Sequence, residues 1–207
     1  MDNDASSLHT RPSLLVRIRD PRDAVSWRAF VELYTPPVLR YCRLRGLQDA
    51  DAADVTQEVM AQVARSMRSF RYAPERGRFR DWLGTITRRK VNRHLTKRHL
   101  GTTGGGGNET PEAIHNPRVI EADPVWSAEF NAQILRAALE KVRPLFGPAT
   151  WNAFAGVWLE NRTAAETASA LGVSLEAVYV AKSKVLKRLE EEVLTLAEDF
   201  PVAHTRI

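Results

Sequence analysis

The chain of 207 residues is 43% hydrophobic and 27% charged, with a formal net charge of +5. These values are typical of a folded globular protein and exclude a disordered one. No stretch approaches about eighteen consecutive apolar residues, so we predict no membrane insertion. The start MDNDASSLHTRPS lacks the basic and apolar regions of a signal peptide, and the single cysteine, Cys42, cannot form an internal disulfide. We therefore expect a cytoplasmic protein in which Cys42 is a buried thiol.

Residues 13–99 show the pattern of several helices separated by short turns. Asp23 can cap a helix that reaches about Tyr34. We expect the pair Pro36-Pro37 to break the chain there, because proline lacks an amide hydrogen and clashes with the preceding helical turn. A second helix should then end near Arg45.

A third helix is predicted from Asp49, and a fourth from Phe79 to about His99, with the loop SFRYAPERGR between them. Each of these two helices has one face of apolar residues at helical spacing. They are Val55, Val59, Met60, Val63 and Met67 in the third helix, and Trp82, Leu83, Ile86, Val91 and Leu95 in the fourth. These faces are expected to form the core.

Positive charge is concentrated in the same part of the chain. Between Arg65 and Arg98 there are twelve lysines and arginines and two acids. The solvated face of a helix normally mixes the two signs, so this one-sided stretch favours contact with phosphate groups.

The composition changes after the fourth helix. Residues 101–125 begin with GTTGGGGNETPEAIHNP, which has no apolar periodicity and predicts a flexible linker. The acids of this linker are Glu109, Glu112, Glu121 and Asp123. Helical periodicity resumes at Trp126 and continues to about Leu196. We therefore expect an all-α protein of two small helical modules joined by a flexible linker.

Residues 160–189 are predicted to form two short helices joined by a tight turn. Thr163 and Glu166 have the spacing of a capping box, and Gly172 stands where a helix can end in a left-handed residue. Ser174 can cap the second helix. The apolar residues expected to face inward are Ala165, Ala168 and Leu171 in the first helix and Val178, Ala181, Val185 and Leu189 in the second. This combination favours a DNA-reading helix-turn-helix over a plain helical hairpin.

The second helix of this pair then has a defined outward face. Its residues are Ser174, Leu175, Glu176, Tyr179, Val180 and Ser183, flanked by Lys182, Lys184 and Lys187. Tyrosine and serine can form hydrogen bonds with bases or phosphates, and valine can contact thymine methyl groups. Since no arginine lies at these positions, we expect modest affinity for DNA from this module alone.

Two segments carry a family resemblance, DVTQEVM at 54–60 and FRDWLGTITRRKVNRHLTKR at 79–98. They resemble region 2 of bacterial sigma factors, most closely that of the two-module ECF group of the sigma-70 family. The helix-turn-helix lies where region 4 of that group is expected. The resemblance implies region 2 at 12–100, a linker at 101–125 and region 4 at 126–196.

The resemblance also implies binding residues. Asp54, Gln57 and Glu58 share one helix face and would contact the clamp helices of RNA polymerase. The implied contacts to the −10 promoter element are Phe70, Arg71, Tyr72, Arg78, Arg88, Arg89, Asn92 and Arg93. Those to the −35 element are Ser174, Glu176, Tyr179, Val180, Lys182, Ser183, Lys184 and Lys187. The acidic linker resembles the segment that enters the path of the nascent RNA.

The implied partners are core RNA polymerase, through its clamp helices and its flap, and promoter DNA. The sequence leaves open whether an anti-sigma factor also binds. No cofactor, metal or catalytic activity is expected. The sequence departs from the family pattern at Arg89, where many ECF proteins have asparagine, and at Tyr179 and Lys184, where arginines are usual.

Two other functions fit part of the sequence. A DNA-binding regulator with an N-terminal interaction domain would bind duplex DNA without polymerase. A metal-dependent nucleic-acid enzyme would use the acidic cluster Asp49, Asp51, Asp54 and Glu58. No nearby histidine completes a ligand set for that enzyme, and no nucleophile–base pair or phosphate loop is present.

Overall fold

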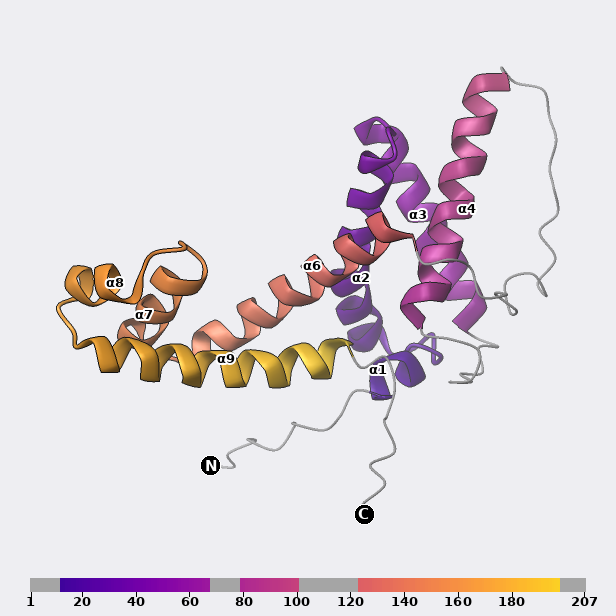
Figure 1. The fold of residues 1–207 in the computed structure, drawn as a ribbon. Helices are drawn as coiled ribbons and strands as arrows, with labels where there is room; N and C mark the ends of the chain where they lie inside the picture. The colour runs from indigo at the N-terminus through magenta and orange to yellow at the C-terminus, as the bar shows by residue number, and fades with distance from the viewer. Residues whose placement is uncertain (1–11, 68–78, 101–122, 198–207) are drawn as a thin grey trace, which may run out of the picture. The chain divides into compact units, whose positions relative to one another are not determined.

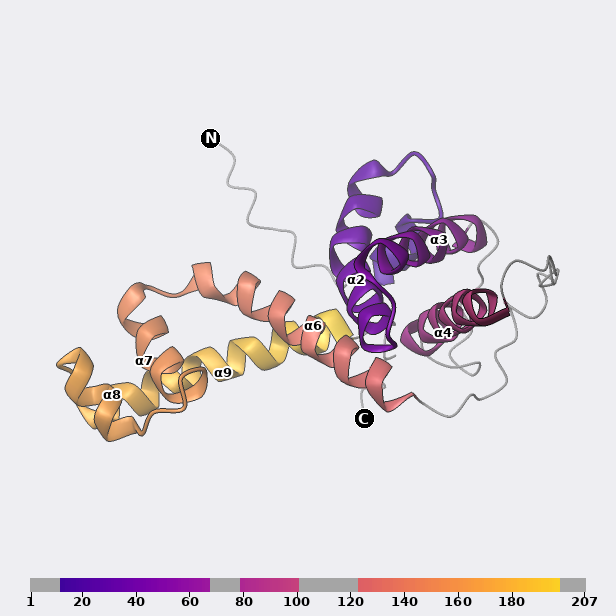
Figure 2. The same ribbon diagram turned by 90° about the horizontal axis from the view of Figure 1, so that it is seen from above.

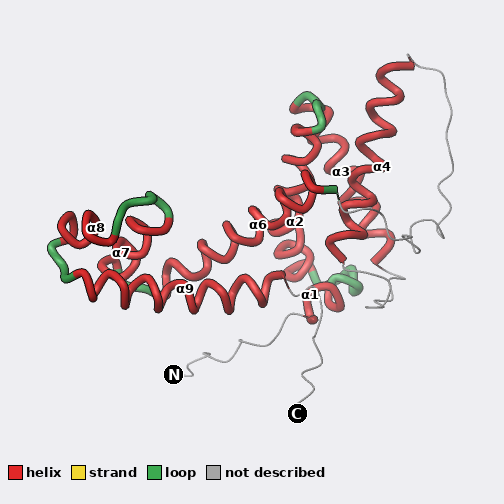
Figure 3. The backbone as a smooth tube through the Cα atoms, in the orientation of Figure 1, coloured by secondary structure: helices red, strands yellow, loops and turns green. Residues whose placement is uncertain are grey.

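The computed structural model describes residues 12–67, 79–100 and 123–197. All regular elements within these ranges are helical (Figure 3), which confirms the all-α fold predicted from the sequence. The described residues divide into two compact units. Unit 1 extends to Gln133, and unit 2 comprises Ile134–Ala197.

Unit 1 contains the helices α1 (Pro12–Arg17), α2 (Ala24–Leu44), α3 (Asp49–Met67) and α4 (Phe79–Leu100). α2, α3 and α4 pack against one another, and α1 packs against α2 (Figure 1; Figure 2). The predicted starts of α3 and α4 are confirmed. Asp23 caps α2 as predicted, since its Oδ1 accepts a hydrogen bond from the Ser26 amide at 2.9 Å.

Aromatic side chains from α2 and α4 form the centre of unit 1. The ring centroids of Phe30 and Tyr34 are 4.6 Å apart. Phe79 contacts both rings edge-on, at 5.8 Å from Phe30 and 5.4 Å from Tyr34. Trp82 and Leu83 are buried, which confirms their expected place in the core.

Cys42 lies in the same core. Its side chain is buried, as the sequence predicted. Burial raises the pKa of the thiol to about 11, although a hydrogen bond with Thr56 acts in the opposite direction. The thiol is therefore protonated and poorly reactive near neutral pH.

The predicted break at Pro36-Pro37 is wrong, because α2 continues through both prolines. Each proline removes one amide donor and crowds the turn before it. Against this local cost, residues on both sides of the pair bury one face of the same helix, among them Phe30, Val38 and Tyr41. Pro37 is itself buried. Tertiary packing therefore outweighs the local preference for a break.

The helix α6 (Pro124–Val142) contributes its first half to unit 1 and its second half to unit 2. In unit 1, the indole N–H of Trp126 donates to the carbonyl oxygen of Arg80 at 2.9 Å. Gly84 leaves the space that the indole fills, since a Cβ there would lie 2.5 Å from Trp126 Nε1. The sequence assigned Trp126 to the second module, whereas its side chain packs on α4. Periodicity shows that a helix forms, but not which core the helix joins.

Polar contacts with α2 reinforce the docking of α6 in unit 1. Arg40 Nε lies 3.1 Å from Glu129 Oε2, and Arg40 Nη2 donates to Gln133 Oε1 at 2.6 Å. Beside these contacts, the ring of Phe130 lies 5.9 Å from that of Tyr34. Residues as far as Gln133 thus belong to the fold of unit 1.

Asp123, which the sequence placed in the linker, caps the start of α6. Its Oδ1 accepts hydrogen bonds from the amides of Val125, at 3.0 Å, and Trp126, at 3.3 Å. Its Oδ2 accepts a hydrogen bond from the Tyr41 hydroxyl and lies 3.8 Å from Arg45 Nη2. Burial acts to raise the pKa of Asp123, but these hydrogen bonds and the charge of Arg45 outweigh it, so the pKa lies below its usual value. Burial and the bond to Asp123 raise the pKa of Tyr41.

Unit 2 continues from α6 through a 3₁₀ turn (Arg143–Leu145) to α7 (Pro148–Trp158), α8 (Ala164–Leu171) and α9 (Leu175–Ala197). The last three helices share a core of Ala153, Ala168, Val178 and Ala181. α7 and α8 approach closely at Gly156, where a Cβ would lie 2.8 Å from Thr167 Cγ2. Small side chains therefore allow these three helices to pack tightly.

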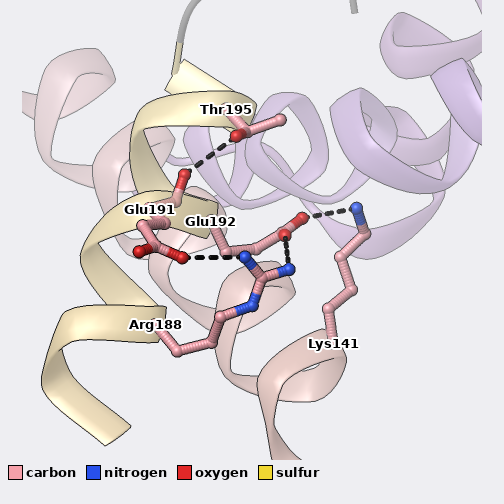
Figure 4. A network of polar contacts seen from close by, with 5 residues as sticks. All are labelled: Lys141, Arg188, Glu191, Glu192 and Thr195. Carbon is pink, nitrogen blue, oxygen red and sulfur yellow. Dashed lines mark hydrogen bonds and ion pairs between the residues drawn. The ribbon is translucent and has the colours of Figure 1, made fainter. Parts of the chain in front are cut away.

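An ionic network connects the last turn of α6 with α9 inside unit 2 (Figure 4). Lys141 Nζ lies 2.7 Å from Oε1 of Glu192, whose side chain is buried. Arg188 contacts Glu191 at 2.9 Å and Glu192 at 3.7 Å, and the Thr195 hydroxyl donates to the Glu191 carbonyl at 2.8 Å. The Glu192 carboxylate thus has two cationic partners, which offset the cost of removing it from water.

Candidate nucleic-acid interface

One side of α4 is neutralised by acids from α3. Lys90 Nζ lies 3.2 Å from Glu58 Oε2, and Asp51 Oδ2 lies 3.5 Å from His94 Nε2 and 3.7 Å from Arg98 Nη1. The three bases follow one another at four-residue spacing, so they form a single row along the helix. Each of the three bases therefore has a carboxylate partner on α3.

A second side of α4 keeps its positive charge. Arg93 and Lys97 are exposed, and neither forms an ion pair within the described part of the chain. Asn92 is exposed beside them, and Arg89 is half-buried one turn earlier. Lys97 was not among the predicted contacts, although its four-residue spacing from Arg93 could have identified it. We call Asn92, Arg93 and Lys97 the basic face of α4.

Arg88, another predicted contact to the −10 element, lies four residues before Asn92 in α4. It is half-buried, and its positive charge acts on the Tyr41 hydroxyl, where it opposes the rise in the pKa of Tyr41. The other predicted residues of this set, Phe70, Arg71, Tyr72 and Arg78, lie outside the described residues.

The predicted polymerase contacts lie on the exposed side of α3. Asp54, Gln57 and Glu58 are exposed, while Val55 and Val59 between them are buried. Glu58 retains 60% exposure of its side chain despite its ion pair with Lys90. The three side chains therefore form one accessible acidic and amide surface.

The turn between α8 and α9 has the local features predicted for it. Thr163 Oγ1 accepts a hydrogen bond from the Glu166 amide at 3.2 Å, and Glu166 Oε2 accepts one from the Thr163 amide at 2.8 Å, which confirms the capping box. Gly172 ends α8 with a φ of +65°, in the left-handed region. Ser174 Oγ accepts a hydrogen bond from the Ala177 amide at 3.1 Å and caps α9.

The buried side of α8 differs from the predicted one. Ala168 is buried as expected, but Ala165 and Leu171 are exposed, and Thr167 is buried instead. α8 packs against both α7 and α9, so two partners determine its orientation. The close approach at Gly156 admits Thr167 and turns Leu171 outward.

The predicted −35 residues lie on the exposed side of α9 and at its cap. Tyr179 and Val180 are 55% and 45% exposed, and the inward set Val178 and Ala181 is buried as predicted. The remaining residues of the set are exposed, except that Lys182 is half-buried: Ser174, Glu176, Ser183, Lys184 and Lys187. Exposed apolar side chains at Leu171, Val173 and Leu175 extend this surface around the turn.

Comparison with known proteins finds one match, within unit 1. Residues 30–100, which include most of α2 and all of α3 and α4, match the family model for Sigma-70 region 2. No curated protein matches the chain. The match to Sigma-70 region 2 supports a role in transcription initiation for this part of the chain.

Two kinds of feature are absent from the described part of the chain, a membrane-spanning helix and a metal-binding cluster. None of its helices has the length and apolar character needed to span a membrane. No cluster of three histidine, cysteine or acidic side chains that could hold a metal ion occurs among the described residues. In particular, the acids of α3 are engaged in ion pairs with α4 at Asp51 and Glu58, and with α2 at Asp49.

Proposed function

We propose that the chain is a cytoplasmic sigma factor of the ECF type. It binds core RNA polymerase, recognises the −35 and −10 elements of a promoter, and helps to open the DNA for transcription. The observation that carries this proposal is the order of its parts. A segment that matches Sigma-70 region 2 is followed by a helical unit in which the capping box of α8, the left-handed Gly172 and the Ser174 cap of α9 support a helix-turn-helix.

In this proposal, α3 binds the polymerase and α4 binds the DNA of the −10 element. Asp54, Gln57 and Glu58 form the surface for the clamp helices of the polymerase. The basic face of α4 holds the opened strand of the −10 element by phosphate contacts, which depend on charge and not on sequence. The predicted −10 contacts of the preceding loop, Phe70, Arg71, Tyr72 and Arg78, would bind a base that is flipped out of the duplex.

Unit 2 would act as region 4, bound to the polymerase flap and placed on duplex DNA. Its exposed α9 residues would enter the major groove of the −35 element, with Lys184 and Lys187 near phosphates. An anti-sigma factor is a further candidate partner, because such proteins control sigma factors of this group.

The test is co-purification of the chain with core RNA polymerase, followed by sequencing of the bound promoter DNA. Asp54→Arg should weaken polymerase binding at least tenfold, since it reverses a charge at the proposed contact without disturbing an ion pair within the described part of the chain. Glu32→Arg in α2 is a matched control, because Glu32 is also exposed on a helix of unit 1 and should tolerate the change.

Three results would contradict the proposal or part of it. Failure of the wild-type chain to bind core polymerase would exclude a sigma factor. Tight binding to duplex DNA without polymerase would favour an ordinary DNA-binding regulator. Equal polymerase binding by Asp54→Arg and wild type would remove the α3 surface from the proposal.

A further inference from the structure

The exposed side of α9 is apolar where it is expected to meet bases and positive where it is expected to meet phosphates. Val180 is 45% exposed, although the neighbouring Ala181 is buried in the core. Lys184, one turn further on the same side, is exposed and forms no ion pair within the described part of the chain. A face of this kind complements duplex DNA better than it complements an apolar protein groove, because a groove would leave the lysine charge unpaired.

The chemistry of base edges then limits what this face can read. Arginine and lysine recognise guanine, asparagine and glutamine recognise adenine, and apolar side chains contact the methyl group of thymine. From Ser174 to Ser183 the sequence contains no arginine, asparagine or glutamine, and the one lysine, Lys182, is half-buried. Val180 therefore has one suitable partner among the base edges, the thymine methyl group.

Glu176 lies one helical turn before Val180 on the same side of α9 and is exposed. Its carboxylate can accept a hydrogen bond from the amino group of cytosine or adenine. Beside a guanine it would face the N7 and O6 acceptors, with no donor to offer them. Glu176 thus disfavours a guanine base at the position that its carboxylate faces.

We propose that Val180 recognises the C5-methyl group of thymine in the −35 duplex, with Glu176 selecting against guanine beside it. This inference rests on the proposed function and specifies the DNA that α9 reads. It predicts a −35 element whose specificity depends on thymine methyl groups.

The experiment uses the holoenzyme of the full chain with core RNA polymerase. A random duplex library is first selected by the holoenzyme, and the strongest duplex is then synthesised with each −35 thymine replaced in turn by deoxyuridine, which removes only the methyl group. At one position or more, deoxyuridine should weaken binding by wild-type holoenzyme about fourfold, the effect of one methyl group buried from water. For Val180→Ala holoenzyme, the thymine and deoxyuridine duplexes should bind equally.

Two matched variants separate this effect from charge and from general damage. Lys184→Ala should weaken the thymine and deoxyuridine duplexes by the same factor, because a phosphate contact carries no base information. Val25→Ala truncates another exposed valine, which lies in α2 and is 75% exposed. It should change the binding of neither the thymine duplex nor the deoxyuridine duplex. Circular dichroism of each variant checks that the helices are retained.

The outcomes are distinct. Deoxyuridine sensitivity in the wild type that disappears in Val180→Ala supports the inference. A selected element without thymine, equal binding of both duplexes by the wild type, or equal sensitivity in Val180→Ala overturns it while leaving the proposed function standing. A holoenzyme that selects no duplex DNA overturns the proposed function and this inference together.

Discussion

α4 of unit 1 and α9 of unit 2 are both long helices rich in basic residues, but they are covered in different ways. α4 is covered on one side by the acids of α3 and on another by Trp126 of α6, whereas its basic face is exposed. α9 is buried along one stripe and leaves Tyr179 and Val180 exposed among lysines. The first helix offers charge almost alone, whereas the second offers a chemically varied face. The comparison separates a surface suited to any nucleic-acid backbone from one suited to particular bases.

The largest expected effect is on stability, when the side chain of Trp126 that packs on α4 is removed. Trp126→Ala removes an indole that is buried against Gly84 and bonded to the Arg80 carbonyl. We expect a loss of about 3–5 kcal/mol in the free energy of unfolding of unit 1, the range for truncation of a buried tryptophan. Denaturant unfolding of the full chain measures the loss, and hydrogen exchange of α4 amides assigns it to unit 1.

Trp158→Ala is the control for this prediction, because Trp158 is 38% exposed and belongs to unit 2. It should affect α7 amides and leave the exchange of α4 amides unchanged. If Trp126→Ala is as stable as the wild type, the docking of α6 does not stabilise unit 1, and Trp126 does not protect that side of α4.

The second prediction concerns the open and the neutralised sides of α4. The double variant Arg93→Ala, Lys97→Ala should weaken binding of the holoenzyme to a single-stranded −10 oligonucleotide and make its salt dependence shallower by about 1.4, for two lost phosphate contacts. Lys90→Ala removes the same kind of charge from the neutralised side, where Glu58 already balances it. It should change the salt dependence little. If the salt dependence of binding is the same for both variants, the basic face of α4 and the side paired with α3 do not differ in their contact with DNA.

The smallest expected effect concerns the cap of α6. Asp123 has a pKa below its usual value in the folded chain, so the stability it contributes is complete above that usual value and is lost as the pH falls through the lowered pKa. Asp123→Asn should reduce the stability of unit 1 at neutral pH by about 1 kcal/mol, since the bonds from Tyr41 and the amides lose their charged acceptor. Below about pH 4 the difference from the wild type should shrink. Unfolding curves at pH 7 and pH 3 measure it, and a difference that grows at low pH would contradict the assignment.

Local features of the fold could be read from the sequence. The caps at Asp23, Thr163 and Ser174 each depend on residues within three positions of one another, so their spacing is sufficient to predict them. The apolar stripe of α3 and the inward stripe of α9 follow from helical periodicity in the same way.

Features that depend on distant partners could not be read in this way. The break predicted at Pro36-Pro37 failed because the burial of α2 against α3 and α4 outweighs a local cost. Asp123 resembled its acidic linker neighbours, and only the position of Tyr41 reveals it as a cap. The candidate site shows the same limit. The basic run in the sequence did not indicate that Lys90 forms an ion pair with Glu58, while Arg93 forms none with the residues that the structure describes.

The contact between Gly84 and Trp126 constrains how the sequence can change. Any side chain at position 84 would occupy the volume that the indole now fills, so the two positions cannot vary independently although they are far apart in the chain. A descendant of this protein with alanine or a larger residue at 84 should carry a smaller residue at 126 or a shifted α6. The pair is therefore a point of expected co-variation, where the order of acceptable changes matters: the tryptophan must be lost or moved before the glycine can be replaced.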